Sequence, residues 1–217
     1  MAVSVKRALV SSALVLASSG SAFTQNIGFS ISGNNINVGA ISFDMVVTQA
    51  ARNCLPNAHA QVQIRASDTT DDLSIAAVGL PPNTDLDLFV IQVPNAPFGL
   101  AWYQGNLQTD DKGNAMQHFG GRFSIRTFIV APGVAAAPVV FPVVSNGSQF
   151  PDAVKNPATG PIHTYHLGLW FNSPTDAQSA GCPNTVTPFN GEHNAGIQVL
   201  NTSDFADNSG PLRNLIP

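Results

Sequence analysis

Hydrophobic and polar residues alternate along much of this chain with a period close to two. In the stretch 73–93, every second residue from Leu73 to Ala77, and again from Leu86 to Val90, is apolar. A period of two is typical of β-strands with one buried face. Residues 79–83, GLPPN, favour a turn because proline presets φ and glycine and asparagine tolerate left-handed conformations. We expect a β-hairpin here, or two strands joined by a short arch.

Further strands are expected where the same alternation recurs between glycine, proline, asparagine or aspartate. These segments are 27–47, 61–66, 100–108, 115–130, 139–144, 162–171 and 195–200. The first should form a hairpin with an asparagine-rich turn. In the fourth, alternate residues from Phe123 to Ile129 would share one face, after a bulge or a break at Gly120 and Gly121.

One short helix is expected near residues 174–180. Ser173 suits the N-cap, Pro174 suits the first helical position, and Gly181 would end the helix. Nine or ten short strands with one such helix describe an all-β protein. The expected fold is an antiparallel β-sandwich of the immunoglobulin-like or jelly-roll-like kind.

The N-terminus has the composition of a secretory signal peptide. Lys6 and Arg7 precede the apolar run Ala8–Ala17, and small residues follow at 20–22. We therefore predict a signal peptide at 1–22 and a single β-sandwich domain at 23–217. The mature protein would be secreted, extracellular or periplasmic, with no membrane span after cleavage, since no later stretch has the required apolar length.

Charge is sparse, which bears on the partners that can be expected. Charged residues make up 10% of the chain, and its formal net charge is −4. Nucleic acids and anionic membranes are bound through basic patches, so this composition disfavours both. The partner remains unknown from charge alone, and a glycan or a component of the cell envelope would fit.

Cys54 and Cys182 are the two cysteines of the chain. In an exported protein, an even number of cysteines favours a disulfide. The alternatives are two buried free thiols and a metal site shared with histidine.

Two parts of the chain resemble exported bacterial proteins. The phrases GLPPNTDLDLFVIQ and YQGNLQTDDKGN resemble the strand–turn–strand pattern of exported bacterial sandwich modules. The later phrases HLGLWFNSPTDA and CPNTVTPFNGEHNAGIQVL are similar to those of a group of uncharacterised secreted bacterial β-sandwich proteins. The resemblance covers most of the chain after the signal peptide. It implies the fold and export, and no activity comes with it.

The five histidines suggest one candidate metal site. His166, Glu192 and His193 could come together if the last strand pairs near the strand at 162–171. Zinc or copper accepts such nitrogen and oxygen ligands. The alternative is that the histidines are satisfied by hydrogen bonds. His163 should point away from His166, because an odd separation on a strand reverses the face.

Catalytic motifs are few. The chain has no GxSxG, SxxK or HExxH motif. Acidic pairs such as Asp71 and Asp72 sit in expected turns, where solvation explains them better than glycoside hydrolysis does. Whether the protein is an enzyme is therefore uncertain, and the sequence leans against it.

Trp102 and Trp170 are candidates for stacking on a sugar ring, with core packing as the alternative. The leading hypothesis is an exported, non-catalytic binding module or a structural module of the cell envelope or extracellular space. A metal-dependent secreted enzyme using His166, Glu192 and His193, and a carbohydrate-binding module, are the alternatives. Only the enzyme would need a cofactor, a divalent metal.

Overall fold

The structure, a computed structural model, describes residues 37–129, 162–189 and 193–217. The predicted signal peptide, the first strand of the 27–47 hairpin and the predicted strand at 139–144 lie outside these residues. Within them, no helix has the length and apolar character that a membrane crossing requires.

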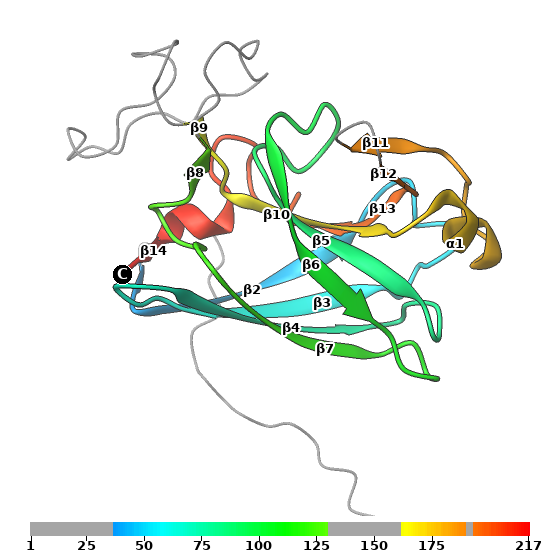
Figure 1. Ribbon diagram of the computed structural model, residues 1–217, viewed down its shortest axis with the longest axis horizontal. Helices are drawn as coiled ribbons and strands as arrows, with labels where there is room; N and C mark the ends of the chain where they lie inside the picture. The colour runs from blue at the N-terminus through cyan, green and yellow to red at the C-terminus, as the bar shows by residue number, and fades with distance from the viewer. Residues whose placement is uncertain (1–36, 130–161, 190–192) are drawn as a thin grey trace, which may run out of the picture.

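Eight antiparallel strands form the main sheet (Figure 1). Across the sheet their order is β6 (Ala101–Gln108), β5 (Asp85–Ile91), β10 (His166–Phe171), β13 (Gln198–Asn201), β2 (Ala40–Val47), β3 (His59–Arg65), β4 (Asp71–Val78) and β7 (Ala115–Gly121). The predicted antiparallel all-β fold is confirmed.

The remaining elements are short. Three two-stranded pairs are β1 (Asn37–Val38) with β14 (Leu215–Ile216), β8 (Phe128–Ile129) with β9 (Ile162–His163), and β11 (Thr187–Phe189) with β12 (His193–Ala195). The helices are α1 (Pro174–Ser179) and a 3-10 turn, η1 (Pro211–Asn214). The short helix predicted near 174–180 is confirmed.

The main sheet folds over, so that its two halves face each other. Figure 1 shows β2, β3, β4 and β7, the first layer, below β5, β6, β10 and β13, the second layer. Inward-facing aliphatic side chains of both layers, such as Val62, Ile75, Leu88 and Leu169, belong to one buried cluster. This burial of apolar surface between the layers is the main force that stabilises the fold.

The segment 79–84 is an arch between the layers, the second of the two alternatives that its sequence allows. β4 pairs with β3 and β7, whereas β5 pairs with β6 and β10, so the two strands do not form a hairpin. Gly79 has φ 70°, and a Cβ there would lie 2.4 Å from the carbonyl oxygen of Asn57. Asn83 has φ 50°. Both positions use the left-handed region that the sequence predicted for this turn.

The prediction of a strand over 122–127 is wrong. β7 ends at Gly121, where a break was one of the two expectations. The buried carboxylate of Asp71 then accepts hydrogen bonds from the backbone N–H groups of Phe123 (2.8 Å) and Ser67 (3.1 Å). The bond to Phe123, with the one from the N–H of Ser124 to the hydroxyl of Thr127 (2.9 Å), holds residues 122–127 in a turn, because these N–H groups are not free for a strand ladder. The interpretation of Asp71 as a solvated turn residue is also wrong.

Candidate functional site

The predicted disulfide is present and joins the two layers. Cys54 and Cys182 are bonded, with their Cα atoms 5.2 Å apart and a separation of 128 positions in sequence. Cys54 follows β2 of the first layer, and Cys182 follows α1, which comes directly after β10 of the second layer. The bond therefore holds the end of α1 against the segment between β2 and β3.

Helix α1 begins and ends as its sequence predicted. The hydroxyl of Ser173 accepts a hydrogen bond from the backbone N–H of Asp176 (3.1 Å) and donates one to its carboxylate (2.6 Å). At the other end, Gly181 has φ 74°, and the N–H of Cys182 donates to the carbonyl of Ala177 (2.9 Å). These caps satisfy backbone groups that a helix of one and a half turns would otherwise leave open.

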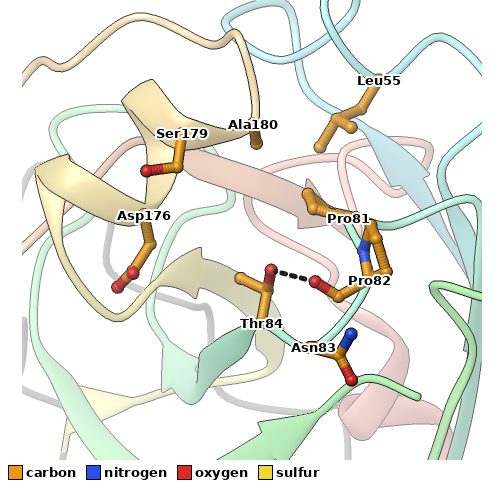
Figure 2. A pocket seen from close by; sticks show the side chains of 8 residues that line it. All are labelled: Leu55, Pro81, Pro82, Asn83, Thr84, Asp176, Ser179 and Ala180. Carbon is orange, nitrogen blue, oxygen red and sulfur yellow. Dashed lines mark hydrogen bonds between the residues drawn. The ribbon is translucent and has the colours of Figure 1, made fainter. Parts of the chain in front are cut away.

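A pocket of about 430 Å³ lies between α1 and the arch 79–84 (Figure 2). We call it the α1 pocket. Three segments far apart in sequence line it: Leu55, beside the disulfide; Pro81, Pro82, Asn83 and Thr84 of the arch; and Asp176, Ser179 and Ala180 of the helix region. The disulfide brings the first and third segments together. The arch is fixed separately, because the hydroxyl of Thr109 donates to the carbonyl of Pro81 (2.6 Å).

The lining of the α1 pocket combines apolar and polar groups. Leu55, Pro81, Pro82 and Ala180 are the apolar members, and Asn83, Thr84, Asp176 and Ser179 the polar ones. The hydroxyls of Thr84 and Ser179 donate to backbone carbonyls, at 3.0 and 2.9 Å, and their oxygens can still accept hydrogen bonds. Asp176 is the one ionisable side chain in this lining. The pocket can therefore hold a small neutral or cationic polar molecule.

His166 is fully buried on the outward side of the second layer. Its Nε2 lies 3.3 Å from the carbonyl oxygen of Asp207, and its Nδ1 lies 2.9 Å from the hydroxyl of Thr202. A carbonyl can only accept, so Nε2–H donates to it and Nδ1 accepts from the threonine O–H. Burial lowers the pKa of His166 to about 4, because the charged imidazolium would lose its hydration. Both ring nitrogens are thus used by the protein, as the non-metal interpretation expects.

The other two predicted metal ligands cannot be placed. Glu192 lies outside the described residues, and of His193 the structure describes only the backbone, in β12. Among the residues that are described, no three histidine, cysteine, aspartate or glutamate side chains gather in a way that could hold a metal ion. The metal site at His166, Glu192 and His193 stays a prediction.

The two tryptophans lie on opposite faces of the second layer. Trp102 is half-buried and packs against the core between the layers. Trp170 is fully buried in a second, smaller cluster on the outward face, where it contacts Phe89 and Phe98. Both rings pack against apolar neighbours, as the core-packing alternative expects. These contacts do not test whether a sugar stacks on either ring, so sugar stacking stays a prediction.

The residues of the α1 pocket received structural interpretations from the sequence. The sequence predicts a turn at Pro81, Pro82 and Asn83, and a short helix over the region that contains Asp176. Both predictions are confirmed. The cysteine pair is the one signal in the sequence that any two of the three lining segments meet. That pair indicates that the regions near Cys54 and Cys182 meet; it does not indicate that the arch joins them.

No protein-family model matches the chain, and a search of curated proteins found no match either.

Proposed function

We propose that the protein is an exported, non-catalytic binding module that holds its ligand in the α1 pocket, as part of the cell envelope or in the extracellular space. The observation that carries this proposal is the lining of the pocket. It combines an apolar side with hydroxyl, amide and carboxylate groups, which is the composition of sites that orient small ligands. Acid–base hydrolysis of a glycosidic bond would need a second carboxyl group, whereas binding needs only the one.

Export is supported by two independent features. The N-terminal sequence has the charged, apolar and small-residue regions of a signal peptide. The chain contains a disulfide, and disulfides form and persist in oxidising compartments such as the periplasm or the extracellular space. The resemblance to secreted bacterial β-sandwich proteins agrees with both, and it belongs to this proposal.

The chemistry of the lining limits the ligand. Asp176 has no lysine or arginine beside it in the pocket, so an anionic group would meet uncompensated negative charge. A sugar unit or an amine-bearing envelope component has polar groups that can hydrogen-bond to Asn83 and Ser179. It also has carbon surface that can pack against the two prolines of the lining.

The proposal is tested by filling the pocket with a side chain. Ser179 is exposed at the end of α1 and lines the pocket, so Ser179→Trp should occupy it. Gln178→Trp is the matched control, because Gln178 is equally exposed on the same helix and is not part of the lining. Saturation-transfer NMR with N-acetylglucosamine, glucose and ethanolamine as probes should give a signal with the wild type and Gln178→Trp, reduced about tenfold or more in Ser179→Trp.

Two results would contradict the proposal. One is equal binding of every probe by Ser179→Trp and Gln178→Trp, which would mean that the ligand lies elsewhere. The other is substrate turnover by purified protein that contains a stoichiometric metal and loses activity in His166→Ala. That result would favour the metal-dependent enzyme instead.

A further inference from the structure

Edge strand β6 contains a bulge that changes which side chains share a face. Leu88 of β5 pairs with Gly105, and the next residue, Phe89, pairs with Tyr103, so Gln104 is an extra residue in β6. A Cβ at Gly105 would lie 2.7 Å from the ring of Phe119, which explains glycine at this position. In a regular strand, residues 103 and 106 would point to opposite faces. The bulge places Tyr103 and Asn106 together on the outward face.

Tyr103 is exposed and held in one orientation. Its side chain is 53% exposed, although its ring packs at 5.5 Å between centroids on Phe89. Phe89 is fixed in turn by the buried ring of Trp170, also at 5.5 Å. The phenol O–H of Tyr103 donates to the side-chain carbonyl of Asn106. A ring held in this way loses little conformational entropy when a ligand covers it.

Polar side chains continue the surface beside Tyr103. Asn106 and Gln108 are exposed along β6, and the exposed Asp85 lies opposite Gln108 in the pairing with β5. The side-chain amide of Asn106 keeps its N–H donors, since its oxygen takes the tyrosine bond. In the part of the chain that is described, no hydrogen bond engages the side chain of Gln108 or Asp85. These groups can therefore bond to a ligand without breaking an internal bond.

The charge of this surface excludes acidic ligands. β5 contributes Asp85 and the buried Asp87, and neither β5 nor β6 contains lysine or arginine. The pKa of the Tyr103 phenol is raised, first by partial burial and then by the negative charge of the Asp87 carboxylate. A nucleic acid or an acidic polysaccharide would meet the negative charge of Asp85 here, and neither strand supplies a basic side chain to bind it.

We infer that Tyr103, Asn106, Gln108 and Asp85 form a second binding site, the Tyr103 face, and that its ligand is a neutral oligosaccharide. The C–H face of a sugar ring is weakly positive and apolar, which suits the negative face of an aromatic ring. The sugar hydroxyls both donate and accept, as the amides and the carboxylate require. The site lies on a sheet surface formed by β5 and β6, with no residue in common with the α1 pocket, and does not depend on that pocket having a ligand.

The test is calorimetric titration of the full mature chain with cellohexaose, xylohexaose, chitohexaose and mannohexaose. At least one should bind, and Tyr103→Ala should weaken that binding about tenfold, the order expected for loss of one aromatic contact. Tyr103→Phe keeps the ring and should retain most of the affinity. Met116→Ala is the matched control, because Met116 is 52% exposed on the other edge strand, β7, and should bind as the wild type does.

Three outcomes overturn the inference. The first is the absence of binding by all four oligosaccharides at millimolar concentration. The second is wild-type affinity in Tyr103→Ala. The third is that Ser179→Trp loses oligosaccharide binding while Tyr103→Ala keeps it. That result would assign the sugar to the α1 pocket and leave the proposed function intact. Loss in Tyr103→Ala alone supports the Tyr103 face whatever the α1 pocket binds.

Discussion

The two layers of the sheet differ in what covers their outward faces. In the first layer, β3 and β4 alternate between buried and solvent-accessible positions, and polar residues such as Gln61 and Arg65 point into water. In the second layer, every residue of β10 and β13 is buried, and so is every residue of β5 after Asp85. The same alternating sequence pattern can therefore belong to a strand with one buried face or with two.

The cover over the second layer comes from segments distant in sequence. The side-chain amide of Asn201 donates to the carbonyl of Pro94 (2.9 Å), which belongs to the loop after β5. His166 is bonded to the 202–207 segment, and Ala195 of β12 joins the cluster around Trp170. Polar side chains on this face need partners, because water cannot supply the bonds that they lost on burial. In β3 and β4 of the first layer, the outward polar side chains are solvent-accessible and have no such requirement.

The largest expected effect is loss of the bond that holds the layers together. Replacing both Cys54 and Cys182 by serine should lower the free energy of unfolding by up to about 5 kcal/mol, because the bond closes a long loop in the unfolded chain. Urea denaturation followed by tryptophan fluorescence measures this change. Wild-type protein held in reducing agent is the control and should approach the variant. Identical midpoints for oxidised and reduced protein would show that the bond adds nothing to the joining of the layers.

A smaller effect is expected from the buried histidine of the second layer. The pKa of His166 is about 4 in the folded state and near 6.5 in an unfolded chain, so the unfolded chain takes up the proton first as pH falls. The contribution of His166 to the unfolding free energy is therefore fully present above pH 6.5 and is lost as pH falls towards 4. The loss should reach about 3 kcal/mol.

Urea denaturation at several pH values between 7 and 4 measures this loss. His166→Gln should flatten the dependence of the unfolding free energy on pH in that range. The control is His118→Gln, because His118 lies on the exposed face of the first layer beside Ser74. If His118→Gln flattens the curve as much as His166→Gln does, the burial of His166 is not the cause.

The smallest of the three expected effects is on the unfolding free energy when a side-chain amide is removed, and it should differ between the two layers. Asn201→Ala should cost about 2 kcal/mol of unfolding free energy, because it leaves the buried carbonyl of Pro94 without this donor. Gln61→Ala, at an exposed position of β3, should stay within about 0.5 kcal/mol of the wild type. Chemical denaturation at neutral pH measures both. Equal losses would contradict the difference between the covered and the solvated face.

Local patterns in the sequence determined the strands of the main sheet, the caps of α1 and the chemistry of the turns. These features depend on neighbours within a few residues: Ser173 caps its own helix, and Asn83 takes its φ from its own turn. The cysteine pair added one long-range contact. Together they were enough for the fold class and the disulfide.

Only the tertiary structure decided which faces are covered and which segments meet. An alternating pattern has the same appearance whether its polar side faces water or another part of the chain, so the burial of His166 and Trp170 could not be read from it. The turn at 79–84 was open to two interpretations, because the choice between hairpin and arch depends on which strands offer free edges. The α1 pocket and the Tyr103 face follow from those choices: one needs the arch beside α1, and the other needs the bulge that Gly105 allows against Phe119.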